Sequence, residues 1–119
     1  MAPSTSAAVR RGPLLVTVQV PRTAAGEILR SGGIEEQSRC VFNQMKTAIE
    51  EAGASLADIA IVQVYLIDMA DWAGMNRVWG EFFASGPALE RATIGVKELA
   101  VPGMLIEIIA TAYLPDAPR

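Results

Sequence analysis

The sequence predicts an α+β domain of order ββαβαββ, in which one mixed sheet carries two helices on one face and leaves the other face apolar. Two segments have apolar residues at helical spacing, and five shorter runs are rich in β-branched residues. Helices and strands alternate in the middle of the chain, and strand pairs stand at both ends, where we expect hairpins. The length of 119 residues suits one domain, 1–119, with flexible tails at 1–6 and 115–119.

The first half of the chain predicts two strands followed by a long helix. Residues 7–11 form a short edge strand, and the β-branched run 14–20 forms a strand that Pro21 ends. A helix follows Gly32 and Gly33, because its apolar residues recur three, four or seven positions apart, and Gly53 is placed to stop it. Its apolar positions are Ile34, Val41, Met45, Ala48, Ile49 and Ala52.

The second half predicts a strand, a second helix and two more strands. Ser55 to Asp58 form a capped turn before a buried strand at 59–67. Asp71 is expected to cap the second helix, which Gly86-Pro87 terminates, and strands at 91–96 and 104–113 follow. We interpret the apolar stripe of that helix as core: Trp72, Met75, Val78, Trp79, Phe82 and Phe83.

The composition predicts self-association outside a membrane. Hydrophobic residues make up 51% of the chain and the mean hydropathy is +0.31, so one small domain leaves apolar surface that another chain must cover. No run approaches the roughly 18 apolar residues of a membrane helix, and the N-terminal residues lack a basic start and an apolar signal core. We therefore expect a cytoplasmic protein with no membrane partner.

The charge pattern and the missing residue types narrow the chemistry. The net charge is −3 and the 10 Lys and Arg residues are scattered, so no basic stripe predicts a nucleic-acid partner. Histidine is absent and Cys40 is the single cysteine, which removes histidine triads, nearly all zinc sites and internal disulfides. We interpret Cys40 as non-catalytic, because no histidine can activate it. Any reaction must use carboxylates, arginine, amides, hydroxyls and water.

Two isolated charges stand in the last two strand runs. Arg91 opens one run, and Glu107 lies among Leu105, Ile106, Ile108 and Ile109, where an unpaired buried carboxylate is costly. One interpretation is an ion pair that fixes a hairpin. The other is substrate binding, because Arg91 follows a loop that can border a cleft and a guanidinium suits bidentate capture of a carboxylate.

Asn76 is a further candidate in the second helix. It lies four residues after Trp72 and three before Trp79, so its amide shares an apolar stripe and must be hydrogen-bonded. A bond to neighbouring backbone is one interpretation. An amide at the rim of a pocket is the other.

Several stretches together carry a family resemblance. They are Gly33-Ile-Glu-Glu-Gln-Ser-Arg39, Gly53-Ala-Ser-Leu-Ala-Asp58, Val64-Tyr-Leu-Ile-Asp-Met69, Asn76 with Phe82-Phe83, Arg91, and Ile106-Glu107-Ile108. From Leu14 to Ala112 the chain thereby resembles the Rid (reactive intermediate deaminase, YjgF-type) family. The resemblance implies a chorismate-mutase-like α+β fold and homotrimers with clefts between subunits.

The resemblance also implies an activity, the hydrolysis of 2-imino or enamine acids to 2-keto acids and ammonia without a metal or cofactor. Arg91 matches the arginine that holds the substrate carboxylate, Glu107 the glutamate that positions a water, and Asn76 the helix asparagine near the pocket. Thr93 stands where relatives often have a small polar residue or cysteine. Thr17-Val18-Gln19 replaces the family's Ser-Gly-Gln beside the substrate, which suggests a specialised enamine such as an aminoacrylate or 2-aminomuconate.

Two rival functions remain open. A non-catalytic homotrimer that binds small carboxylates would use Arg91 in the same way, with Glu107 as its structural counter-ion. Ribonuclease activity, sometimes attributed to the family, fits poorly with the acidic charge balance and the absence of histidine.

Overall fold

A computed structural model describes residues 7–86 and 88–114. Their elements follow the predicted order ββαβαββ, with two short 3-10 helices, η1 (Leu56–Asp58) and η2 (Met69–Asp71), in addition. The predicted tails at 1–6 and 115–119, and Pro87, lie outside the described residues. The helices are α1 (Gly33–Glu51) and α2 (Trp72–Phe83), and the strands are β1 (Val9–Arg11), β2 (Leu14–Gln19), β3 (Ile59–Leu66), β4 (Glu90–Gly95) and β5 (Ile106–Tyr113).

The five described strands form one mixed sheet in the order β1-β2-β5-β3-β4. β3 and β4 run parallel and are joined by α2, whereas the other neighbours are antiparallel. The predicted N-terminal hairpin is confirmed. The predicted C-terminal hairpin is wrong, because β3 lies between β4 and β5. β5 carries apolar residues on both faces, and a central position buries them better than an edge would.

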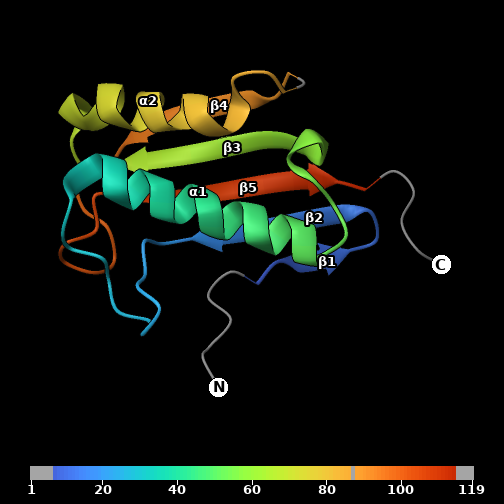
Figure 1. Ribbon diagram of the computed structural model, residues 1–119, viewed down its shortest axis with the longest axis horizontal. Coiled ribbons are helices and arrows are strands. Elements are labelled where there is room, and N and C mark those ends of the chain that lie inside the picture. The colour runs from blue at the N-terminus through green and yellow to red at the C-terminus, as the bar shows by residue number, and fades with distance from the viewer. Residues whose placement is uncertain (1–6, 87, 115–119) are drawn as a thin grey trace.

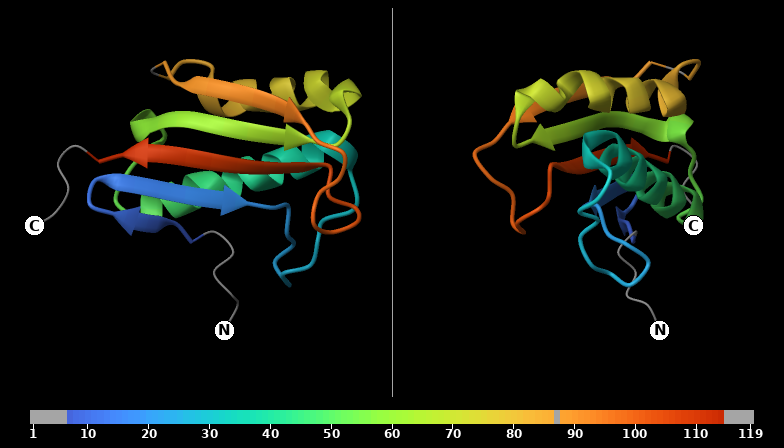
Figure 2. Two further views of the ribbon diagram at one scale, coloured as in Figure 1. Left: turned by 180° about the vertical axis from the view of Figure 1, so that it is seen from behind. Right: turned by 60° about the vertical axis from the view of Figure 1, so that its left-hand side comes forward.

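Both helices cover the same face of the sheet, as predicted (Figure 1). α1 buries Val41, Phe42, Met45 and Ile49 completely against β2, β3 and β5. The rear view in Figure 2 shows the opposite face without a described helix over it. There Leu14 and Val18 are 43% and 48% exposed. The described chain therefore leaves apolar sheet surface uncovered, in line with its composition.

The helix ends follow local chemistry that the sequence predicts only in part. Gly53, just after α1, has a φ of 92°, a left-handed conformation that glycine adopts at little cost. The Asp58 carboxylate accepts from the Ser55 backbone N–H at 2.9 Å, so the predicted capped turn is confirmed. Asp71 makes no capping hydrogen bond with its side chain. Asp71 does occupy the N-cap position of α2, as predicted, whereas the side-chain capping bond is made one turn earlier by Asp68, whose Oδ1 accepts from the backbone N–H of Ala70 at 2.9 Å at the start of η2.

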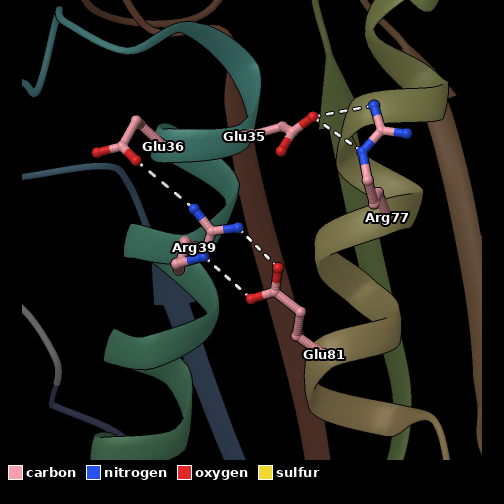
Figure 3. Close-up of polar contacts among 5 residues, drawn as sticks. All are labelled: Glu35, Glu36, Arg39, Arg77 and Glu81. Atoms are coloured by element: carbon pink, nitrogen blue, oxygen red, sulfur yellow. Dashed lines mark hydrogen bonds and ion pairs between the residues drawn. The ribbon is translucent and has the colours of Figure 1, made fainter.

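Exposed ion pairs join the two helices (Figure 3). Arg39 donates to both carboxylate oxygens of Glu81, at 3.0 and 2.7 Å, and also lies 3.5 Å from Glu36. Arg77 lies 2.9 Å from a Glu35 oxygen. Because these groups are exposed, the pairs contribute little to stability.

Replacing Glu81 with glutamine is expected to lower stability slightly at neutral pH and less in acid. Hydrogen bonding from Arg39 lowers the pKa of Glu81 in the fold. The stabilisation is therefore complete above the ordinary glutamate pKa and is lost as the pH falls through the lowered value. Thermal unfolding of both proteins from pH 7 downwards measures this as a shrinking difference in Tm. A difference that is constant or grows in acid would contradict the assignment.

Candidate functional site

Arg91 lies near the start of β4, the strand at one edge of the sheet. Its half-buried side chain packs against α2, with Cζ 4.8 Å from the centre of the Trp79 indole and 5.7 Å from that of Trp72. Both distances allow cation–π attraction. Burial lowers the pKa of Arg91, but a guanidinium keeps its proton in proteins. This edge of the sheet therefore presents a partly desolvated positive charge.

Asn76 holds that charge in place. Arg91 Nη1 donates to Asn76 Oδ1 at 2.8 Å, so the amide binds the arginine side chain rather than neighbouring backbone. Within residues 7–86 and 88–114, none of the ion pairs involves Arg91. A guanidinium has five N–H donors, and the bond to Asn76 uses one. Asn76 and Arg91, which the sequence singled out separately, thus form one unit that can receive an anion.

Glu107 lies on the other face of the sheet. Arg91 is paired with Val62 on β3, and Glu107 with Tyr65 on the same strand. Side chains alternate between the faces of a strand, so positions three residues apart point in opposite directions. The interpretation of Arg91 and Glu107 as a hairpin ion pair is therefore wrong. Glu107 is half-buried on the face that the helices leave open.

Thr17 and Val18 also lie on opposite faces of the sheet. Thr17 is 2% exposed on the helix-covered face, where its hydroxyl accepts from Gln19 Nε2 at 2.7 Å. It shares a sheet row with Arg91, but two strands stand between them, which corresponds to about 14 Å. Val18 pairs with Ile109 on the open face and is therefore a diagonal neighbour of Glu107. Val18, not Thr17, is therefore the neighbour of the Glu107 carboxylate.

Thr93 lies on the same strand and the same sheet face as Arg91. It stands two residues after Arg91 on β4, and is therefore on the same face, where it is half-buried and pairs with Val64. The predicted site residues thus divide into two groups. One group, Arg91, Asn76 and Thr93, lies at the β4 edge beside α2, and the other, Glu107 and Val18, lies on the open sheet face.

Sequence reasoning missed a buried glutamine that positions the loop before β5. Gln37 is 1% exposed, and its amide donates to the carbonyls of Leu29 and Gly103 and accepts from the Leu105 N–H, each at 2.8 Å. Leu105 lies two residues before Glu107, so this clamp sets where β5 begins. The sequence does indicate that Gln37 is buried, because it lies three residues after Ile34 and four before Val41 in the apolar stripe of the helix.

Tyr65 was also missed as a neighbour of the predicted carboxylate. It stands directly opposite Glu107 on β3, and its hydroxyl accepts from Gln63 Nε2 at 2.9 Å. Both residues are half-buried on the open face. The alternation of Gln63 and Tyr65 with buried valines along the strand is the signal that could have indicated this polar row.

Two cavities stand away from these groups. One, of about 500 Å³, is lined by Arg22, Gly26, Glu27, Ile28, Arg30 and Val101. The other, of about 430 Å³, lies under residues 97–104 beside Ile67. Neither is lined by Arg91 or Glu107, so neither cavity belongs to the two groups of predicted residues.

The Cys40 thiol is hydrogen-bonded and partly buried. Its thiol lies 3.2 Å from the Arg22 carbonyl, to which it donates, and burial raises its pKa. A raised pKa disfavours the nucleophilic thiolate. Within the described part of the chain, no three Cys, Asp or Glu side chains are grouped to hold a metal ion, and neither α1 nor α2 has the length and apolar character for a bilayer crossing.

Comparison with known proteins shows which family the chain resembles. Residues 2–114 match the family model described as Endoribonuclease L-PSP. A RutC family protein of Pyrococcus abyssi is 43% identical over 102 residues, covering 84% of this chain and 77% of that protein. A 2-iminobutanoate/2-iminopropanoate deaminase of Dermatophagoides farinae is 33% identical over 98 residues, covering 74% of this chain and 76% of its own length.

The fold is also similar to that of a solved structure. The crystal structure of Rv2704 from Mycobacterium tuberculosis, a member of the YjgF/YER057c/UK114 family, superposes with a TM-score of 0.77 at 30% identity. The match covers 90% of this chain and 84% of that one. The predicted α+β class and family are thereby confirmed. The chain belongs to the Rid (YjgF-type) family, whose model bears the description Endoribonuclease L-PSP.

Proposed function

We propose that this protein is a deaminase that hydrolyses 2-imino or enamine acids to 2-keto acids and ammonia. The observation that carries the proposal is the Arg91 guanidinium, which is half-buried, oriented by Asn76, and outside every ion pair of the described residues. Such a partly desolvated cation gains more from a bound carboxylate than an exposed one does. The deaminase name of the Dermatophagoides relative supports the same chemistry.

The reaction needs a carboxylate anchor and one acid–base group. Arg91 holds the substrate carboxylate and fixes the adjacent C=N carbon. Glu107 accepts a proton from water as the water oxygen bonds to that carbon and the C=N electron pair moves to nitrogen. The Glu107 carboxyl returns this proton to the nitrogen, which gives the carbinolamine. Glu107 then takes the proton of the new hydroxyl and passes it to the nitrogen, so that the C–N bond breaks, ammonia leaves and the C=O bond of the keto acid forms. The imine is already electrophilic, so the proposal requires no metal or cofactor.

We further propose that the complete site lies between subunits of a homotrimer. Arg91 at the β4 edge and Glu107 on the open face point in opposite directions within one chain. A neighbouring chain whose open face meets the β4 edge brings the two groups together and also covers Leu14 and Val18. Light scattering at micromolar concentration is expected to give about three times 12.7 kDa. A monomer mass would contradict the proposal.

A coupled assay tests the activity. An amino-acid oxidase generates imino acids in place, semicarbazide traps those that remain, and the protein is expected to reduce trapping by hydrolysing them first. The Arg91→Ala variant should lose this effect, by about 100-fold in kcat/KM, because the carboxylate anchor is gone. Arg77→Ala, which removes an exposed arginine of α2, is the matched control and should behave like wild type. Equal rates for wild type and Arg91→Ala would overturn the assignment.

The same assay separates the deaminase from a non-catalytic carboxylate-binding protein. Saturable binding of 2-keto acids by wild type, lost in Arg91→Ala, together with no turnover of any imino acid, would favour the binding protein. Glu107→Gln discriminates further, because it should abolish turnover in an enzyme while leaving keto-acid binding nearly intact. RNA cleavage that survives in both variants would instead point to a different site.

A further inference from the structure

The two indoles beside Arg91 differ in what surrounds them. Trp79 packs edge-on against Phe42, with ring centres 5.7 Å apart, and against Phe83 at 4.2 Å, so it is anchored in the core. Trp72 is 40% exposed and begins α2. Trp79 therefore supports the guanidinium from the protein side. Trp72 leaves part of its indole uncovered next to the same charge.

Because Trp72 lies beside the Arg91 guanidinium, a carboxylate bound to that guanidinium lies near the indole. Asn76 holds Arg91 Nη1 at 2.8 Å, and the Arg91 Cζ lies 5.7 Å from the centre of the Trp72 ring. In a 2-imino acid, two bonds separate the carboxylate carbon from the first carbon of the side chain. A substrate anchored on Arg91 can thus extend its side chain over the exposed indole, whereas a methyl side chain makes little contact with it.

We infer that Trp72 receives the substrate's side chain and that the preferred substrates are 2-imino acids with aromatic or long aliphatic side chains. The inference rests on the proposed function, because it names the substrate class of the same site. The aromatic face offers apolar contact to such a side chain. An additional large apolar group in a complementary pocket typically changes kcat/KM by 10-fold or more. The preference should therefore be measurable.

The kinetic test compares imino acids generated from phenylalanine, leucine and alanine by a suitable amino-acid oxidase. Wild type is expected to have a kcat/KM about 10-fold higher or more for the first two substrates. Trp72→Ala should lose that preference, so that its kcat/KM values for the three substrates lie within about 2-fold of one another. Met69→Ala, which trims another exposed apolar side chain three residues earlier, is the control and should keep the preference. Trp72→Phe retains an aromatic face and should keep most of it.

A binding measurement separates failure of this inference from failure of the deaminase proposal. Calorimetry with phenylpyruvate and pyruvate, two non-reacting 2-keto acids, should show about 10-fold tighter binding of phenylpyruvate by wild type and no difference in Trp72→Ala. Equal affinities and equal rates for large and small substrates would overturn the role of Trp72 while leaving the deaminase intact. A clear affinity preference without turnover of any imine would instead overturn the deaminase. Light scattering of Trp72→Ala must give the wild-type mass, because a change in assembly would assign Trp72 to a subunit contact instead.

Discussion

Mixing the Arg91→Ala and Glu107→Gln variants is expected to restore deaminase activity that neither variant has alone. The sheet register sends the two side chains to opposite faces. In the proposed trimer, one chain therefore supplies the arginine of a site and its neighbour supplies the glutamate. In a random mixture, a site is intact when its arginine comes from the Glu107→Gln subunit and its glutamate from the Arg91→Ala subunit. About a quarter of the sites meet that condition.

The measurement is kcat per site after the two variants are unfolded and refolded together. The doubly substituted Arg91→Ala/Glu107→Gln chain, refolded with wild type in the same way, controls for the mixing. Separately refolded variants that are mixed without exchange of subunits should stay inactive. No recovery in properly mixed trimers would mean that both groups act from the same chain, and the inter-subunit site would be abandoned.

Replacing Gln37 with leucine is expected to destabilise the fold by about 3 to 5 kcal/mol. The amide satisfies two carbonyls and one N–H in the interior, and each buried group left without a partner costs about 1–3 kcal/mol. Against a total stability of about 5–15 kcal/mol, this loss is large. Urea unfolding followed by circular dichroism, at one fixed protein concentration, measures it. Asn43→Leu, an exposed position of the same helix, is the control and should change stability little.

The Gln37→Glu variant tests whether the two hydrogen bonds that Gln37 donates are needed for stability. A carboxylate can still accept from the Leu105 N–H, but it cannot donate to the carbonyls of Leu29 and Gly103. The destabilisation should therefore be large at neutral pH and smaller in acid, where a protonated carboxyl regains one donor. A Gln37→Glu protein as stable as wild type at pH 7 would show that the clamp contributes little.

The order of elements could be predicted because local patterns determine it. The helical spacing of Val41, Met45 and Ile49 predicts α1, and Gly53 predicts its end. Asp71 stands at the N-cap position of α2 as predicted, but its side chain makes no capping bond. Asp68 and Asp71 are both acceptable caps by residue type, and the backbone path of η2 decides that the side chain of Asp68 makes such a bond.

The pairing of strands could not be predicted in the same way. A run such as Ile106 to Tyr113 has the same composition whether it pairs with β4 as a hairpin or inserts between β2 and β3. That choice depends on how the whole sheet buries its apolar faces, which involves residues far apart in the chain. The same choice decides the side on which Glu107 lies, because the pairing with β3 sets its face.

What the sequence by itself determined is the set of candidate site residues and the family. Arg91, Glu107 and Asn76 could be singled out because isolated polar groups in apolar runs need a partner. Only the tertiary structure decided which of these groups meet. It joined Arg91 to Asn76 and separated both from Glu107, since hydrogen bonds across the sheet set the register and the register sets the face of every side chain.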